Sequence, residues 1–267
     1  MSRLLIGIAA AVLVFYGIAS LMMLLFGNRF MFHPPRWRDD VNGLMLLDTG
    51  TERFGALYLP PPDDRAYVIL HSHGNGENLS TVQSWLRTLH DHGYGVIGYD
   101  YPGYGASTGT PDEAGVYRCV ETAYRYLTET AKIPPERIIS MGYSLGTGPA
   151  TYIAAKERTA GLLLEAPYST VVEAVIPFRS PVNHFCSIDR IRKINCPLIV
   201  IHGGKDTVVA CRSGKKLFNH ARPPKEMVFI PDGTHYNLHN HLGDRYWDLL
   251  KSLPGMKPDA ESSSVVR

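Results

Sequence analysis

The sequence predicts an α/β fold with a mostly parallel, doubly wound sheet. Short, continuous apolar runs, typical of strands buried on both faces, alternate along the chain with longer segments of helical periodicity. Glycine and proline are abundant, at 25 and 19 residues, as expected where many short turns join such elements. Because a helix fits between most consecutive strands, repeated β/α/β units are expected.

The first elements are predicted between residues 53 and 130. Arg53–Leu59 alternates apolar and polar residues and predicts an early strand, whereas Ala66–His71 and Val96–Asp100 are apolar runs that predict buried strands. Thr81–Asp91 and Pro111–Thr130 repeat apolar residues at helical spacing. Helices therefore follow strands here, as β/α units require.

The same alternation continues to residue 253. Arg137–Met141 predicts a buried strand, and Thr147–Lys156 predicts the helix that follows it. The later elements are strands at Gly161–Glu165, Leu198–His202 and Met227–Ile230, with helices around Leu217 and at Tyr246–Leu253. Pro254–Arg267 is small and polar, and predicts a disordered tail.

The N-terminal segment predicts a transmembrane helix. Leu4–Phe26 has no charged residue and, at ~1.5 Å per residue, is long enough as a helix to cross a bilayer. It is apolar on every face, which argues against a helix of the soluble core. A signal peptide cleaved near Gly17–Ala19 is the alternative, but the apolar run continues to Phe26, which is unusual for a mature N-terminus.

The charges around this segment favour a single-pass protein with its folded domain on the cytoplasmic side. Arg3 precedes the segment, whereas Arg29, Arg36 and Arg38 follow it. The predicted organisation is an anchor at residues 1–30, a linker at 31–50, a folded domain at 51–253 and the tail at 254–267.

Composition excludes several classes of function. The net charge is +2 and the body of the chain has no basic block, so no nucleic-acid partner is expected. The four cysteines (Cys119, Cys186, Cys196 and Cys211) have no metal-ligand spacing, and no metal or organic cofactor is expected. Cys186 and Cys196 could pair in an oxidising compartment.

Two copies of the Gly-x-Ser-x-Gly pattern occur, at Gly105–Gly109 and at Gly142–Gly146. The second stands between a predicted strand and a predicted helix, the setting that exposes a nucleophilic serine at the end of a parallel sheet. Ser144 is therefore the candidate nucleophile. The first copy follows a Pro/Gly turn, so Ser107 is interpreted as a loop residue.

A serine nucleophile needs a histidine base and an acid that orients it. Asp206 directly follows the strand Leu198–His202 and is the leading acid, with Glu165 and Asp232 as alternatives. His235 follows the last predicted strand and is the candidate base, which gives the order Ser, Asp, His. The neighbouring His239 and His241 are interpreted as surface residues of the last helix.

An oxyanion hole requires two backbone N–H groups that converge on the reacting carbonyl. Leu145, directly after Ser144, is one candidate donor. The other is Asn75, in the glycine-rich loop after Ala66–His71. A phosphate-binding loop is the alternative for this segment, but no GxxxxGK[ST] pattern is present.

Five motifs together resemble an α/β-hydrolase-fold serine hydrolase, in the membrane-anchored branch that includes lysophospholipid lipases and protein depalmitoylases. They are His73-Gly-Asn75, Tyr99 to Ser107 (YDYPGYGAS), Gly142 to Gly146 (GYSLG), His202 to Asp206 (HGGKD) and Gly233-Thr-His235. The resemblance implies a Ser144–His235–Asp206 triad, oxyanion donors at Asn75 and Leu145, and a structural turn role for Ser107.

The resemblance further implies hydrolysis of acyl esters or thioesters of membrane-associated substrates. The insert that would carry a lid, residues 167–197, is too short for a cap domain. Its apolar residues could line an acyl pocket or be the packed face of a short helix: Val171, Val172, Val175, Ile176, Pro177 and Phe178. A serine peptidase and a non-catalytic binding protein on the same scaffold remain the alternatives.

Overall fold

In the computed structural model, a nine-stranded sheet runs through the described part of the chain, which comprises residues 5–8, 10–11, 14–17, 27–29, 31–38, 40–171, 173 and 183–266. The strands are β1 (Leu44–Asp48), β2 (Arg53–Leu59), β3 (Val68–Ser72), β4 (Gly95–Tyr99), β5 (Ile138–Tyr143), β6 (Gly161–Glu165), β7 (Leu198–Gly203), β8 (Lys225–Ile230) and β9 (Glu261–Val265). Their order is β1-β2-β4-β3-β5-β6-β7-β8-β9. β2 is antiparallel to β1 and to β4, and the other neighbouring pairs are parallel. The mostly parallel sheet predicted from the sequence is thus confirmed.

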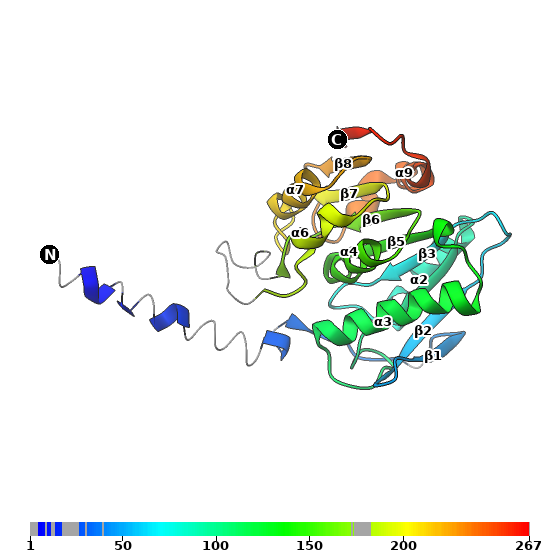
Figure 1. The fold of residues 1–267 in the computed structure, drawn as a ribbon, viewed down its shortest axis with the longest axis horizontal. Helices are drawn as coiled ribbons and strands as arrows, with labels where there is room; N and C mark the ends of the chain where they lie inside the picture. Colours follow the sequence, from blue (N-terminus) through cyan, green and yellow to red (C-terminus); the bar gives the residue numbers. More distant parts are fainter. Residues whose placement is uncertain are drawn as a thin grey trace.

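Helices cover both faces of this sheet (Figure 1). The α-helices are α2 (Leu79–Asp91), α3 (Glu113–Arg125), α4 (Thr147–Lys156), α6 (Ser187–Arg190), α7 (Cys211–His220), α8 (Leu238–Leu242) and α9 (Arg245–Ser252). Shorter helical turns span Tyr126–Thr130, Pro135–Arg137, Ser144–Gly146, Ile191–Lys193 and Leu253–Gly255. Apolar residues of α2 and α9 pack in one core cluster with Ile69, whereas α3 packs in another with Val68 and Leu70, because successive strand residues point to opposite faces.

Local capping decides where the first helices begin. The Asn78 side chain accepts the Thr81 N–H, and the Asn78 N–H donates to the Thr81 hydroxyl, which forms a capping box and starts α2 at Leu79. Asp112 likewise accepts the Gly115 N–H at 2.6 Å, so α3 starts at Glu113. Both helices begin within two residues of the predicted positions.

The register of the parallel strands sets where the loops meet. Ser72 of β3 pairs with Gly142 of β5, and Glu165 of β6 pairs with both Tyr143 and Ile201. The carboxyl ends of β3, β5, β6 and β7 therefore lie at one edge of the sheet, which is where open α/β sheets form their sites.

Two segments differ from the sequence-based prediction. The predicted linker at residues 31–50 contains β1, and the predicted disordered tail contains β9, which pairs with β8. The polar strand β9 is held on β8 by backbone hydrogen bonds, which do not require apolar side chains. Lys225 and Glu261 add an ion pair at 3.3 Å, and Arg245 donates to the Ser264 hydroxyl at 2.7 Å.

Part of the predicted transmembrane span lies outside the described residues: residues 4, 9, 12–13 and 18–26. Among the positions that are described, no helix is both long enough and apolar enough to cross a membrane.

Candidate active site

Ser144 occupies a tight turn between β5 and α4. Its backbone φ is 50°, in the left-handed region that non-glycine residues rarely adopt. Glycines on both sides make this turn possible. A Cβ at Gly142 would lie 2.3 Å from the Gly146 carbonyl oxygen, and one at Gly146 would lie 2.0 Å from the Ser72 carbonyl oxygen. The turn therefore packs directly against the end of β3, with Ser144 at the edge where the strands end.

His235 is the residue that contacts the Ser144 hydroxyl. It lies in the loop after β8, and its Nε2 is 2.9 Å from Ser144 Oγ. The His235 Nδ1 is 2.7 Å from Asp206 Oδ2. Because an Nδ1–H that donates to Asp206 leaves Nε2 as an acceptor, Nε2 is free to receive the serine proton. Tyr143 donates its hydroxyl to the His235 carbonyl at 3.0 Å and fixes this loop.

Asp206 is buried, and four polar groups around its carboxylate hold it in position. Its Oδ1 accepts the Val208 and Val209 N–H groups at 2.9 and 2.7 Å, and its Oδ2 faces His235. His202 Nε2 lies 3.4 Å from the same Oδ2. Burial would raise the pKa of Asp206, but hydrogen bonds from both histidines and from Val209 outweigh it and hold the pKa well below its usual range.

The alternative acids lie in other surroundings. Asp232 is exposed and pairs with Lys205 at 2.7 Å. Glu165 is buried and accepts hydrogen bonds from His239 and from the Tyr246 hydroxyl at 2.8 and 2.6 Å. Of the three candidate carboxylates, Asp206 is thus the one that the structure brings to His235.

Ser107, the serine of the other Gly-x-Ser-x-Gly copy, has a structural environment. Its Oγ accepts the Gly55 N–H at 3.1 Å, and its own N–H donates to the Tyr104 carbonyl at 2.8 Å. These bonds tie the turn after β4 to β2, as expected from the loop interpretation.

The candidate oxyanion donors lie on the two segments that meet at the Ser144 turn. Leu145 directly follows the serine, and its carbonyl accepts the Tyr168 hydroxyl at 2.9 Å. Asn75 follows β3, and its side chain is fully engaged. Its Oδ1 accepts the Tyr104 hydroxyl at 2.7 Å and the His33 N–H at 3.0 Å, and its amide donates to the Met31 carbonyl at 2.6 Å.

The segment that holds Asn75 comes from the predicted linker. Phe32 is 4% exposed and makes edge contacts with Tyr104 and Phe185. The segment Met31–His33 is therefore docked on the folded domain and braces the loop that carries Asn75. Sequence reasoning missed this contact because it joins residues more than forty positions apart.

His239 lies at the surface as expected, with 38% of its side chain exposed, but it also makes contacts that were not predicted from the sequence. Its ring stacks on Trp85 with centroids 4.3 Å apart and bonds the buried Glu165. Burial opposes its charge, but Glu165 raises the pKa of His239 above the ordinary value. Burial would likewise raise the pKa of Glu165, but His239 and Tyr246 lower it. The spacing of His239, four residues after His235, was visible in the sequence. Its contact with Glu165 on β6 was not, because the two residues are far apart in the chain.

The remaining expectations concern metals, cysteines and the lid. Within the described residues, no group of three or more His, Cys, Asp or Glu side chains is placed to hold a metal ion. All four cysteines are free thiols, so Cys186 and Cys196 are not paired. Of the apolar lid residues, Val171 is half-buried against the core, whereas positions 172 and 175–178 lie outside the described residues.

A mostly parallel sheet, with a serine at the strand-to-helix turn and an acid and a histidine after later strands, defines the α/β-hydrolase class. Comparison with known proteins agrees with this class. Residues 67–174 match the model of the alpha/beta hydrolase fold family. Alpha/beta hydrolase domain-containing protein 17B of Homo sapiens is 30% identical over 222 residues, which is 82% of this chain and 76% of that protein.

A further relative and one solved structure show the extent of the similarity in sequence and in fold. Alpha/beta hydrolase domain-containing protein aho-3 of Caenorhabditis elegans is 30% identical over 212 residues, and the match spans 78% of this chain and 63% of that protein. The structure of the Pyrococcus furiosus esterase Pf2001 superposes with a TM-score of 0.67 at 15% identity, covering 85% of this chain and 99% of the esterase. The 30% identity to the human protein, over 82% of this chain and 76% of that protein, shows that the chain belongs to the α/β-hydrolase family.

Proposed function

We propose that this protein is a serine hydrolase that cleaves carboxylic ester or thioester bonds through an acyl-enzyme. One observation carries the proposal: a continuous chain of contacts runs from Ser144 Oγ through both ring nitrogens of His235 to the Asp206 carboxylate, with distances of 2.9 and 2.7 Å. This arrangement supplies a nucleophile, a base and a group that orients the base.

In the proposed reaction, His235 Nε2 takes the proton of Ser144 as Oγ attacks the acyl carbonyl carbon. The carbonyl oxygen becomes an oxyanion, which the N–H groups of Asn75 and Leu145 stabilise. Collapse of this intermediate breaks the bond to the leaving alcohol or thiol, which receives the proton from His235. A water molecule, deprotonated by His235, then attacks the acyl-enzyme, and Ser144 regains its proton when the carboxylic acid leaves.

The proposed substrates are membrane-associated, of the lipase, lysophospholipase or acyl-protein thioesterase type. The support is the uncharged segment Leu4–Phe26, which we propose anchors the chain as a single-pass helix. We propose further that the folded domain lies on the cytoplasmic side, which the arginines after this segment favour. An anchored enzyme meets acyl groups that are held at the bilayer surface, and membrane lipid is then a partner of the N-terminal helix.

The test is to reconstitute the full-length protein in phosphatidylcholine vesicles. We expect labelling by a fluorophosphonate probe, together with hydrolysis of long-chain lysophospholipid or acyl-peptide thioester substrates in the same membrane. A folded protein that takes no label would contradict the serine-hydrolase proposal. Hydrolysis limited to short, water-soluble esters would instead contradict the membrane-associated substrate class.

Removing the side chain of Asn75 should slow catalysis although its proposed donor is a backbone group. We expect Asn75→Ala to lower kcat for a soluble ester by about tenfold with little change in KM. This is less than the ~10²–10³ lost with an oxyanion donor itself, because the donor stays but is held less firmly. Tyr104→Phe removes one of the bonds to Asn75 Oδ1 and should have a smaller effect. An unchanged kcat in a stable Asn75→Ala protein would refute the bracing role.

A further inference from the structure

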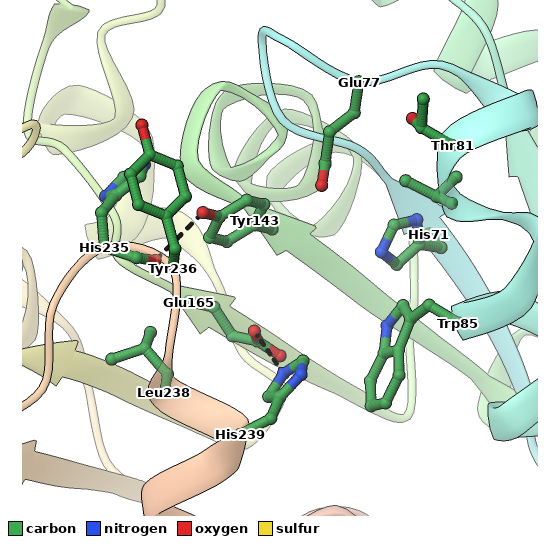
Figure 2. Close-up of a pocket in the computed structure, with 11 residues that line it drawn as sticks. His71, Glu77, Thr81, Trp85, Tyr143, Glu165, His235, Tyr236, Leu238 and His239 are labelled. Carbon is green, nitrogen blue, oxygen red and sulfur yellow. Dashed lines mark hydrogen bonds and ion pairs between the residues drawn. The ribbon is translucent and has the colours of Figure 1, made fainter.

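A cavity of about 250 Å³ lies beside His235 (Figure 2). Its walls come from α2, from the ends of β3, β5 and β6, and from the loop and helix that follow β8. His235 and Tyr236 line it on the side of the proposed triad. The cavity therefore borders the His235 loop, and it adjoins the Ser144 turn through Tyr143 and the Asn75 loop through Glu77, although Ser144, Asn75 and Leu145 do not themselves line it.

The position of the cavity matches the leaving-group side of the proposed reaction. His235 must give its proton to the departing alcohol or thiol, so the leaving group has to lie within reach of this imidazole. The acyl oxygen must instead face the backbone donors near Asn75 and Leu145. A group attached to the leaving alcohol can thus enter the cavity that His235 borders.

The charge of the cavity favours a cation. Glu77 extends toward its centre (Figure 2), and within the described residues Glu77 accepts the Gly74 N–H at 2.6 Å but has no ion-pair partner. The negative charge of the second carboxylate, Glu165, is offset by His239, whose Nε2 lies 2.8 Å from Glu165 Oε2. Burial lowers the pKa of His71 to about 3, so this ring is neutral. Among the described residues, the cavity lining has no lysine or arginine, and Glu77 and Glu165 both act on His239, so the two carboxylates exceed the single charge that this histidine can carry.

The aromatic lining favours a quaternary rather than a primary ammonium group. Trp85, Tyr143 and Tyr236 line the cavity, and aromatic rings together with a carboxylate are the groups that attract trimethylammonium. A primary ammonium would need three hydrogen-bond acceptors. Glu165 is already engaged by His239 and Tyr246, and Glu77 accepts the Gly74 N–H, which leaves His71 Nδ1 as an unpartnered ring nitrogen, whereas a trimethylammonium group requires no acceptor.

Tyr236 adds an independent indication of a ligand. It is 80% exposed, although large aromatic side chains are usually buried, and its ring meets His235 edge-on at 5.1 Å. An exposed aromatic at the mouth of an acidic cavity is placed to cover a bound cation.

We propose that this cavity binds a quaternary ammonium group carried by the leaving alcohol of the substrate, as in a choline ester. The proposal rests on the serine-hydrolase function proposed above and defines the substrate class of that site. Glu77 supplies the charge, and Trp85, Tyr143 and Tyr236 supply the aromatic surface.

The test compares two esters that differ only in charge, butyrylcholine and its carbon isostere 3,3-dimethylbutyl butyrate, on the full-length protein. We expect kcat/KM to be about tenfold higher for the choline ester in the wild type. Glu77→Gln keeps an acceptor for the Gly74 N–H but removes the charge, and should reduce this ratio to about two or less. Tyr236→Ala removes a largely exposed ring that contacts His235, and should also reduce this ratio.

Glu129→Gln is the matched control, because it removes one charge from an exposed residue that does not line the cavity and should leave the ratio unchanged. Equal rates for both esters in the wild type, or a preference that survives Glu77→Gln, would overturn the proposal. A preference for an S-octanoyl-cysteine peptide with a neighbouring lysine over its norleucine analogue, without one for choline, would overturn the quaternary assignment. If the wild type hydrolyses no ester or thioester, the serine-hydrolase proposal itself fails, and the cavity proposal falls with it.

Discussion

Ser144→Ala should lower kcat/KM for ester hydrolysis by about 10⁴–10⁶-fold and abolish labelling by a fluorophosphonate probe. The variant lacks the oxygen that forms the acyl-enzyme, and losses of this size follow removal of a serine nucleophile. The fold should persist, because alanine meets the same backbone strain at a φ of 50° that serine already bears. Steady-state kinetics and gel-based labelling measure the effect, and circular dichroism checks the fold.

The chain contains its own control for this experiment. Ser107 stands in the same pentapeptide pattern, but its Oγ bonds the Gly55 N–H and lies in the turn after β4. Ser107→Ala should therefore keep full labelling and near wild-type kcat, at some cost in stability from the lost hydrogen bond. Labelling that disappears with Ser107→Ala and persists with Ser144→Ala would reverse the assignment of the nucleophile.

Asp206→Asn should lower kcat by about 10⁴-fold with a small change in KM. An asparagine amide in place of Oδ2 would donate to His235 Nδ1 and favour the tautomer in which Nε2 carries the proton and cannot accept another. The pKa of Asp206 is held well below its usual range, so the wild-type carboxylate is ionised from moderately acidic pH upward. The change should therefore be measurable at any pH at which the protein is folded.

Asp232→Asn supplies the comparison, since Asp232 was an alternative acid and pairs only with the exposed Lys205 among the described residues. It should retain wild-type kinetics. A large loss of kcat with Asp232→Asn and a small one with Asp206→Asn would show that another carboxylate serves His235.

The central part of the fold could be predicted because its strands are apolar on both faces. β6 lies where the sequence predicted it, and β3 and β4 are shifted by one or two residues. The edge strand β9 was missed for a physical reason. β9 has the sequence ESSSV, and its pairing with β8 depends on backbone groups that every sequence offers.

The arrangement of Ser144, Asp206 and His235 was predictable from their positions after successive strands, because parallel pairing brings strand ends together. The contacts made by the residues around this site could not be predicted from the sequence. Glu165 meets His239 across 74 residues, and Met31 meets Asn75 across 44. Neither contact leaves a local pattern, because each depends on how loops and helices pack in three dimensions.

The docking of Phe32 limits how far the site can stand from a membrane. A fully extended chain covers at most ~3.6 Å per residue, so Phe32 lies within about 22 Å of Phe26, the last residue of the proposed anchor. Phe32 in turn contacts Tyr104, whose hydroxyl bonds Asn75 beside the Ser144 turn. Under the proposed anchoring, this short tether confines the enzyme to acyl bonds near the bilayer surface and leaves those displayed on distant soluble domains out of reach.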